Sequence, residues 1–328
     1  DGFRVATDML GSQPVYKAES GTSDKLCIGT NADIVTDIVG HRHEMDLVSI
    51  GEFLVYDQIS FPFTTYQRTR EMDPAAVHQW HFKEGVCLAS SHVYWQPSEP
   101  NIWPRRNDIA DELESALRLA AEEISRGTHK LAITLSGGRD SRTVLALMRA
   151  TGIEAALTYC TRENRETDVA TQVAKLAGVR HLLVRREPHF YGKVLERTMA
   201  LIGSEVRGEA HGFAVFDAQL AEQFDVIVGG YLSDTLLKDH FMPLAQREQL
   251  RRKTFRERMA SVFRSKKTRP MPSTRWAASR DMLCPEIRDQ VESRRRERLA
   301  QIARIRPESA EEWQGFWPIS RQHDVGSA

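Results

Sequence analysis

The chain lacks paired cysteines. Its 328 residues include four, which stand far apart with no C-x-x-C pair among them: Cys27, Cys87, Cys160 and Cys284. This spacing argues against both a zinc site and a disulfide framework. Because free thiols persist in reducing compartments, we expect a cytoplasmic protein.

Long apolar runs and a net charge are lacking as well. No apolar run approaches the ~18 residues that a membrane-spanning helix needs, and no signal peptide is visible. The 45 Lys and Arg residues balance 45 Asp and Glu residues, so the whole molecule has no charge excess typical of nucleic-acid or membrane binding. We therefore expect no membrane partner.

The composition that is present fits a globular protein. Hydrophobic residues make up 41% of the chain and charged residues 27%, which is ordinary for such proteins. A chain of this length can bury a sizeable core, and it predicts about two domains.

One stretch in the middle of the chain has the pattern of an anion site. The apolar run 131–135 predicts a buried strand, and apolar residues from Val144 to Met148 recur at helical spacing. Between them lies Ser136-Gly137-Gly138-Arg139-Asp140-Ser141. Glycines let the backbone approach a ligand, while the first turn of a helix offers free N–H groups and a favourable dipole. The stretch therefore predicts a phosphate site, although a glycine-rich turn in any doubly wound sheet is the alternative.

The carboxylate in this loop predicts a metal ion. Asp140 would repel a phosphate group unless a cation lay between them, which favours bound Mg²⁺. The spacing does not match a Walker A loop, because G-x-x-x-x-G-K-[ST] is absent. Instead, the loop resembles the SGGxDS pyrophosphate loop (PP-loop) of the N-type ATP pyrophosphatases. That family cleaves ATP between the α and β phosphates, adenylates a substrate and releases pyrophosphate.

The first hundred residues predict an α+β layer dominated by short strands. Alternating and apolar runs predict strands and a closing hairpin, while two stretches favour short helices. The expected strands are near 3–7, 15–18, 25–29, 77–82 and 85–89, and the expected helices are near 31–39 and 45–56.

This part of the chain resembles the back half of the glutaminase-like domain of the asparagine synthetases. The sequence ATDMLGSQPVYK at 6–17 stands where that family has D-x-x-G-x-x-P-L-Y, and 61–77 is a degenerate form of its later T-x-x-x-x-I-x-x-L-x-P-G segment. The family's glutaminase nucleophile is an N-terminal Cys, which has no counterpart here. Cys27 and Cys87 fit buried small side chains better. We expect a partial glutaminase-like (Ntn-like) domain over 1–104 without glutaminase activity.

A cluster of prolines near residue 104 predicts a domain boundary. Beyond it, apolar runs alternate with helical patterns, which favours an α/β fold with a doubly wound parallel sheet. The resemblance implies the PP-loop, adenine nucleotide α-hydrolase-like form of this fold over 105–328. Within it, we expect Asp168 to face water at the start of a helix and His181 to begin a strand rather than to act as a base.

A second glycine motif follows the predicted strand 224–228. Two glycines at a strand end allow a nucleotide to approach the backbone, and Asp234 adds a second carboxylate for Mg²⁺. The segment Gly229-Gly230-Tyr231-Leu232-Ser233-Asp234 resembles the G-x-G-[SA]-D-E loop of the asparagine synthetases, in which the Asp helps to hold the metal. Leu232 and Thr235 depart from that pattern. A glycine turn followed by a solvated Asp is the alternative.

The resemblance also implies a role for each site residue. Asp140 and Asp234 would hold Mg²⁺ and are the expected catalytic residues. The expected pyrophosphate ligands are Ser136, Gly137, Gly138 and Ser141, and the adenosine would contact the backbone of Leu135, Tyr159, Gly229 and Gly230. Arg139 and Arg142 stand where the family usually has small or apolar residues. They are either surface residues or ligands of a phosphate or a substrate carboxylate.

The expected function is that of an ATP-dependent, AMP-forming carbon–nitrogen ligase with ATP and Mg²⁺ as cofactors. A carboxylate of a small molecule or peptide would be adenylated, and an amine would then displace AMP. The amine is either ammonia, as in asparagine synthetases, or a substrate amine, as in β-lactam synthetases and lasso-peptide cyclases. The alternatives are a tRNA-modifying PP-loop enzyme and a catalytically inactive scaffold of the same fold. A homodimer is the candidate assembly.

One segment carries a local charge excess. Residues 247–306 contain 19 Lys and Arg but only 7 Asp and Glu, and Arg294-Arg295-Arg296 is a dense point. Helical periodicity from Leu250 to Phe263, and again from Ile287 to Ile302, predicts an amphipathic helical insertion. This basic segment is either a solvated face or an electrostatic surface for an acidic partner or an RNA backbone.

Overall fold

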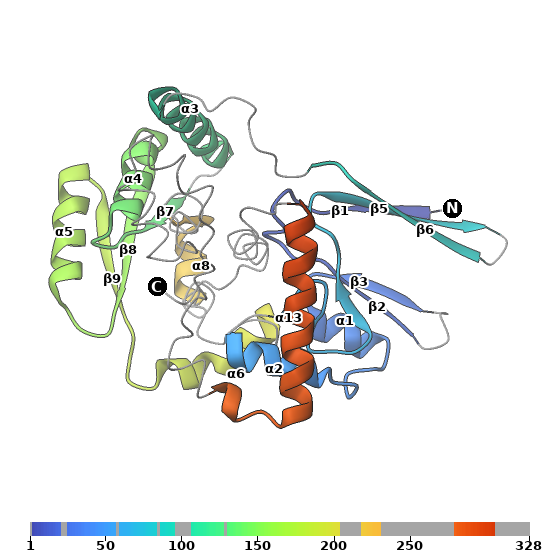
Figure 1. Cartoon of the computed structure of the whole chain (residues 1–328). Helices are drawn as coiled ribbons and strands as arrows, with labels where there is room; N and C mark the ends of the chain where they lie inside the picture. Colours follow the sequence, from blue (N-terminus) through green and yellow to red (C-terminus); the bar gives the residue numbers. More distant parts are fainter. Residues whose placement is uncertain are drawn as a thin grey trace, which may run out of the picture. The chain divides into compact units, whose positions relative to one another are not determined.

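The computed structural model describes residues 2–20, 25–56, 59–83, 86–95, 106–127, 130–203, 218–230 and 279–305. These residues form two compact units (Figure 1). The first unit contains the described residues up to 95, together with 199–203 and 279–305. The second unit contains 106–198 and 218–230. The boundary that we place after residue 104 stays a prediction.

Two antiparallel sheets form the β-structure of the first unit. One has the order β1-β5-β6 and the other the order β3-β2-β4. The strands are β1 (Gly2–Ala6), β2 (Tyr16–Glu19), β3 (Leu26–Gly29), β4 (Thr69–Glu71), β5 (Ala76–Lys83) and β6 (Val86–Val93). The predicted hairpin is confirmed, because Lys83 pairs with Val86 across its turn. Strand β4 is not predicted from the sequence, since three residues are too few to show a period.

Two short helices pack in the first unit where the sequence predicts them. α1 (Ala32–Ile38) begins after Asn31, whose side-chain oxygen accepts hydrogen bonds from the N–H groups of Asp33 and Ile34 at 3.0 and 3.2 Å. α2 is Leu47–Tyr56. The buried core around α1 and β2 consists of Tyr16, Ala18, Ala32, Val35, Val39 and Tyr66.

A helix from late in the chain completes this unit. α13 (Pro285–Ile305) packs along α2, and Val291 on it is only 2% exposed. A glycine in α2 lets the helices approach, because a Cβ at Gly51 would lie 2.9 Å from Val291 Cγ2 and 3.0 Å from Ile287 Cγ2. The helix predicted from Ile287 to Ile302 is therefore present, and it belongs to the first unit, whereas the periodic stretch from Leu250 to Phe263 lies outside the described residues.

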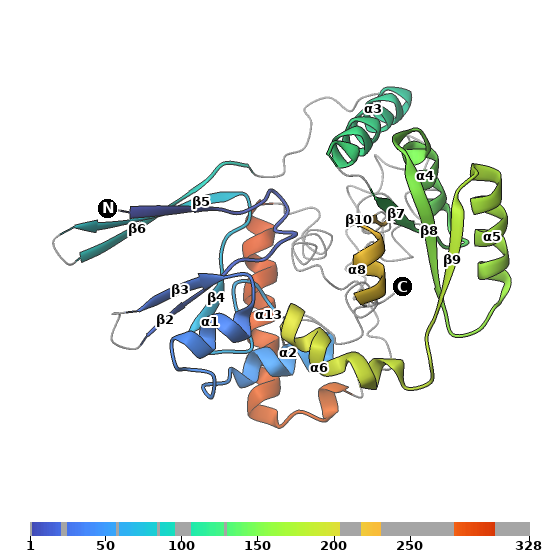
Figure 2. The same cartoon turned by 180° about the vertical axis from the view of Figure 1, so that it is seen from behind.

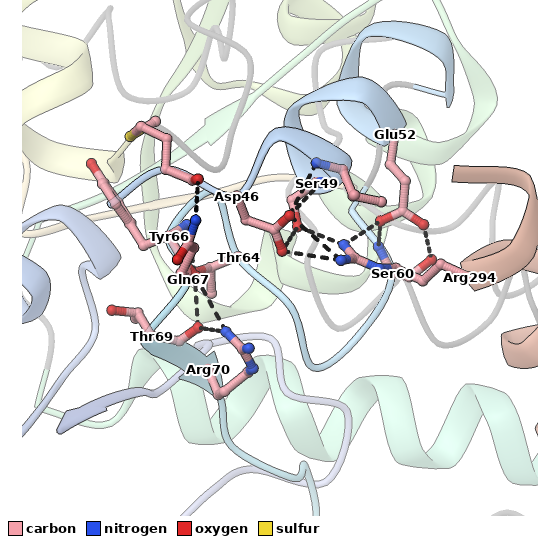
Figure 3. Close-up of polar contacts among 12 residues, drawn as sticks. Asp46, Ser49, Glu52, Ser60, Thr64, Tyr66, Gln67, Thr69, Arg70 and Arg294 are labelled. Atoms are coloured by element: carbon pink, nitrogen blue, oxygen red, sulfur yellow. Dashed lines mark hydrogen bonds and ion pairs between the residues drawn. The ribbon is translucent and has the colours of Figure 1, made fainter. Parts of the chain in front are cut away.

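An arginine of the basic segment lies partly buried against α2 and the residues beside it (Figure 3). The guanidinium of Arg294 donates to Ser49 Oγ at 2.9 Å and to Asp46 Oδ2 at 3.1 Å, and it pairs with Glu52 Oε2 at 3.5 Å. It also lies 3.9 Å from the centre of the Phe63 ring. Two further arginines of α13 stack on aromatic rings of the same unit: Arg295 on Tyr56 and Arg298 on Phe61. The densest part of the basic segment is thus engaged within the chain.

The second unit is built on a parallel sheet of order β10-β7-β8-β9 (Figure 2). Its strands are β7 (Leu131–Thr134), β8 (Ile153–Cys160), β9 (Arg180–Arg185) and β10 (Val226–Val228). The helices are α3 (Arg106–Ser125), α4 (Arg139–Met148), α5 (Arg165–Ala177), α6 (Phe190–Ile202), which continues into the first unit, and α8 (Ala218–Gln223). The α/β class with a parallel sheet is confirmed. The glutaminase-like identity of the first unit stays a prediction.

Alternating side chains of the sheet pack on both of its faces. On one face, Ala132 and Leu157 join Leu220 and Phe224, which lie in and just after α8. On the other face, Ile133 and Ala156 join residues of α4 and α5, among them Leu145, Ala170 and Ala174. Helices cover both faces, and in sheets of this kind ligands bind at the carboxyl ends of the strands.

Candidate functional site

The loop after β7 leads directly into a helix N-terminus. β7 ends at Thr134, and α4 begins at Arg139 after an extended N-cap residue, Gly138, with φ −71° and ψ 164°. Because Gly138 has no side chain, the N-cap residue itself makes no side-chain capping bond. The N–H groups of a first helical turn have no partners within the helix, so those of α4 point toward the loop and suit an anion.

Two serines of the predicted loop hold it closed. The N–H of Ser136 donates to Ser141 Oγ at 3.0 Å, and that hydroxyl donates back to Ser136 O at 3.2 Å. The N–H of Gly138 donates to Ser136 Oγ at 3.1 Å. Ser141 is 8% exposed. Each hydroxyl therefore shapes the loop, and contact of either with a phosphate stays a prediction.

The two glycines of the loop differ in how much room a side chain would have. A Cβ at Gly138 would lie 3.1 Å from Ser136 Oγ. A Cβ at Gly137 would lie 3.4 Å from Glu166 Cγ and 3.5 Å from its Cα, at the start of α5. The contacts at Gly137 are ordinary van der Waals distances, whereas a side chain at Gly138 would crowd the hydroxyl of Ser136.

The structure brings the two predicted glycine motifs together. A Cβ at Gly230 would lie 3.1 Å from the carbonyl carbon of Asp140 and 3.2 Å from the backbone nitrogen of Ser141. A Cβ at Gly229 would lie 3.0 Å from Thr134 Oγ1. The end of β10 thus lies against both the end of β7 and the first turn of α4. The rest of the second motif, including Asp234, lies outside the described residues.

The other two predicted nucleotide contacts are placed by β8. Leu135 is 2% exposed, its N–H donates to Leu157 O at 2.8 Å, and its carbonyl accepts from Thr158 Oγ1 at 2.7 Å. Tyr159, near the carboxyl end of β8, is partly buried against the sheet face that α8 covers. Both backbone groups of Leu135 are therefore already bonded to the neighbouring strand. A ligand could still donate to the second lone pair of its carbonyl oxygen.

Sequence reasoning missed a polar pair beside this loop. His181 Nε2 lies 2.8 Å from Thr158 Oγ1, and His181 Nδ1 lies 3.1 Å from Thr171 Oγ1. Burial lowers the pKa of His181 below its ordinary value of 6.5. The parallel register of β8 and β9 creates this contact, with His181 opposite Ala156. No short motif could have revealed it.

The remaining predicted polar residues have local contacts. Arg142 Nε donates to Gly138 O at 3.0 Å, so this guanidinium lies over the start of α4. Asp168 is exposed in the first turn of α5, where Asn164 supplies the cap. Within the described ranges, no group of three or more His, Cys, Asp and Glu could hold a metal ion by itself. None of the described helices is long and apolar enough to span a bilayer.

Three solved structures show weak similarity to the chain, each at 15% identity. An ammonia-dependent NAD synthetase from Campylobacter jejuni has a TM-score of 0.30, with 39% of this chain and 59% of that chain covered. A predicted subunit of a tRNA methyltransferase from Methanocaldococcus jannaschii has a TM-score of 0.25, with 39% and 64% covered. An NMN synthetase from Francisella tularensis has a TM-score of 0.32, with 66% and 96% covered. The chain thus spans less than two thirds of the first two proteins.

A search of curated protein sequences gave no match. The comparison with protein-family models, in contrast, gave a match over most of the chain. The family model for asparagine synthase matches residues 112–325, which is more than half of the chain and includes both glycine motifs and α13. The chain therefore belongs to the asparagine synthase family.

Proposed function

We propose that this chain is an AMP-forming carbon–nitrogen ligase, which adenylates a carboxylate and joins it to an amine. Membership of the asparagine synthase family supports the general class, an ATP-dependent amide-forming synthetase. The observation that best supports an AMP-forming reaction is the packing of Gly230 against Asp140 and Ser141 at the N-terminus of α4. It joins the two motifs expected to bind one nucleotide at the carboxyl end of a parallel strand.

The proposed chemistry needs positioning and charge stabilisation more than a nucleophile from the protein. An oxygen of the substrate carboxylate attacks the α-phosphorus of ATP, and the bond to the β-phosphate oxygen breaks, which gives an acyl-adenylate and pyrophosphate. The amine then attacks the acyl carbon, AMP leaves with the former carboxylate oxygen, and the nitrogen loses a proton. The N–H groups that begin α4 bind the leaving pyrophosphate, as the helix dipole favours.

The residues present also fit Mg²⁺. This ion is commonly bound by one or two carboxylates together with phosphate oxygens, so it needs no larger cluster of protein ligands. Asp140 lies in the first turn of α4 beside the proposed pyrophosphate site, and its Cβ would be 3.3 Å from a Cβ at Gly230. Asp140 and Asp234 would hold the ion, which when bound neutralises charge on the leaving pyrophosphate.

A small-molecule or peptide carboxylate and an amine donor are the proposed partners, with a cytoplasmic location and a homodimer as further proposals. The in-chain contacts of Arg294, Arg295 and Arg298 reduce the support for RNA binding by this part of the basic segment. The tRNA-modifying alternative therefore ranks below the ligase.

The test is an ATP–pyrophosphate exchange screen of the full chain over candidate carboxylates. A correct carboxylate should make labelled pyrophosphate enter ATP only when Mg²⁺ is present, and AMP should accumulate once an amine is added. Formation of ADP and phosphate, or exchange that does not depend on the carboxylate, would overturn the proposal.

A further inference from the structure

A chain of hydrogen bonds leads from β9 to the residue before the loop. His181 Nδ1 lies 3.1 Å from Thr171 Oγ1, and His181 Nε2 lies 2.8 Å from Thr158 Oγ1. Thr158 Oγ1 lies 2.7 Å from Leu135 O. Thr158 is 4% exposed and Leu135 is 2% exposed, so water cannot easily replace these bonds.

The number of protons available decides which atom donates in each of these hydrogen bonds. A threonine hydroxyl has one proton, and the carbonyl of Leu135 can only accept it. Thr158 Oγ1 must therefore accept from His181 Nε2, which carries a proton. Burial lowers the pKa of His181 because the charged form is desolvated, so at neutral pH the ring holds a single proton, on Nε2. By the same count, a Thr171 hydroxyl that donates to Thr167 O at 2.8 Å would need a proton on Nδ1, so the two threonines compete for the single proton of the ring. We place that proton on Nε2 because the Thr158 contact is shorter, 2.8 Å against 3.1 Å, and Thr158 is more buried; the exposed hydroxyl of Thr171 then donates to Nδ1 instead of Thr167 O.

This series of hydrogen bonds ends at the peptide group that begins the loop. The carbonyl of Leu135 and the N–H of Ser136 belong to one planar peptide group. Thr158 holds its oxygen at 2.7 Å, and Ser141 Oγ accepts from its N–H at 3.0 Å. Because the plane is held at both edges, its rotation would break a bond on either side. Its orientation sets where Ser136 Oγ lies, and that hydroxyl accepts from the N–H of Gly138.

We propose that His181 is a positioning residue for the ATP site, which acts through Thr158 on the Leu135–Ser136 peptide plane and so orients the pyrophosphate loop. The inference rests on the proposed function. It assigns His181 no contact with the nucleotide and no proton transfer in the reaction. Its role is to supply a fixed donor that keeps the hydroxyl of Thr158 aimed at Leu135 O.

The first measurement is the affinity of the full chain for α,β-methylene-ATP with Mg²⁺, by calorimetry. His181→Phe fills a similar volume without a donor, and it should bind about three- to tenfold more weakly, which is the effect expected of one lost hydrogen bond. His181→Gln can place an amide N–H near the position of Nε2, and it should restore most of the affinity. Equal affinity for both variants, whether normal or weakened, would overturn the proposal.

The second comparison uses the threonine, and it carries the test if His181→Phe does not fold. Thr158→Val should weaken binding as much as His181→Phe, whereas Thr158→Ser should retain it. Thr151→Val is the matched control, because that hydroxyl makes a local bond to Met148 O at 2.7 Å, just after α4. The double variant His181→Phe with Thr158→Val should bind no more weakly than either single variant. Additive losses would mean that the two residues act independently.

A spectroscopic signature separates positioning from general stabilisation. The ¹⁵N shifts of the His181 ring should show a neutral imidazole protonated at Nε2 at neutral pH, and Thr158→Val should shift the tautomer balance toward Nδ1. A ring protonated at Nδ1 in the wild type would overturn the proposed direction. If the wild type binds no ATP analogue although its ring has the expected tautomer, the proposed function fails, and the positioning role fails with it.

Discussion

Gly230 approaches the backbone of Ser141 so closely that a methyl group between them would lie 3.2 Å from the Ser141 nitrogen. The sequence predicts that glycines at this strand end let a nucleotide approach. In the structure, the missing side chain of Gly230 also lets the first turn of α4 approach β10. One small residue therefore sets the spacing between the two halves of the proposed nucleotide site.

Gly230→Ala tests that spacing. The added methyl would contact backbone atoms of Asp140 and Ser141, which cannot turn aside as a side chain can, so α4 and β10 must move apart. We expect about tenfold weaker binding of α,β-methylene-ATP, measured by calorimetry. Gly192→Ala in α6 is the control, because a Cβ there meets nothing within 4 Å. That helical substitution should leave affinity unchanged and stabilise the protein by roughly 0.4–1 kcal/mol. Unchanged binding by Gly230→Ala would contradict the close-packing argument.

Asp140→Asn tests the proposed magnesium ligand. The amide keeps the size of the side chain but removes the charge, so pyrophosphate release that depends on the carboxylate substrate should be abolished while the thermal midpoint stays close to that of the wild type. The matched control is Asp168→Asn, an exposed first-turn position on α5 that should keep full activity. Normal turnover by Asp140→Asn would show that the ion is held elsewhere.

Arg294→Met tests the buried ion pairs of the first unit. The side chains of Asp46 and Glu52 are 11% and 2% exposed, and the variant would leave both without the cation that they contact. Removing one partner of a buried pair typically costs about 3–5 kcal/mol of unfolding free energy. Urea unfolding, followed by the fluorescence of buried Trp80 in the same unit, measures the loss. Arg296→Met on the exposed side of α13 should change stability by less than about 0.5 kcal/mol. Equal effects of the two variants would refute the assignment.

The lowered pKa of Asp8 predicts that the protein loses stability in acid. Burial alone would raise the pKa of this carboxylate, but hydrogen bonds from the N–H groups of Gln13, Ser12 and Leu10 bring it below the ordinary value of 3.8. A folded-state pKa below the unfolded value gives stability that is present above pH 3.8 and is lost as the pH falls through the folded-state pKa.

The comparison with Asp8→Asn isolates this contribution. The difference in unfolding free energy between wild type and variant, from urea titrations at several pH values, should be constant near neutral pH. It should shrink as the pH falls below 3.8. A difference that grows in acid would mean that the carboxylate is destabilised by folding.

Local pattern predicts most elements near the proposed site. The apolar run ending at Leu135, the six-residue loop and the helical spacing from Val144 correspond to β7, the turn and α4. Gly178 ends α5 with a φ of 72°, as a glycine after a helical pattern predicts. These features depend on neighbours within a few residues, so the sequence contains their signal directly.

Contacts between distant residues are what the pattern does not contain. The register that brings His181 to Thr158 arises when β8 and β9 pair, and neither strand shows it alone. The charge run around Arg294 has the composition of a solvated face, yet that residue pairs with Asp46 and stacks on Phe63. Composition cannot distinguish the two environments, because only the partner, 248 residues away, makes burial of the charge tolerable.

The placement of α13 also bears on how the protein is made. Asp46 leaves the ribosome 248 residues before Arg294, which at about 5–20 residues per second corresponds to a delay of roughly 12–50 s. Throughout that time Asp46 and Glu52 lack the guanidinium of Arg294, and Gly51 lacks its contacts with Ile287 and Val291. The first unit can therefore be completed only after the second unit has been translated, because α13 follows both in the sequence.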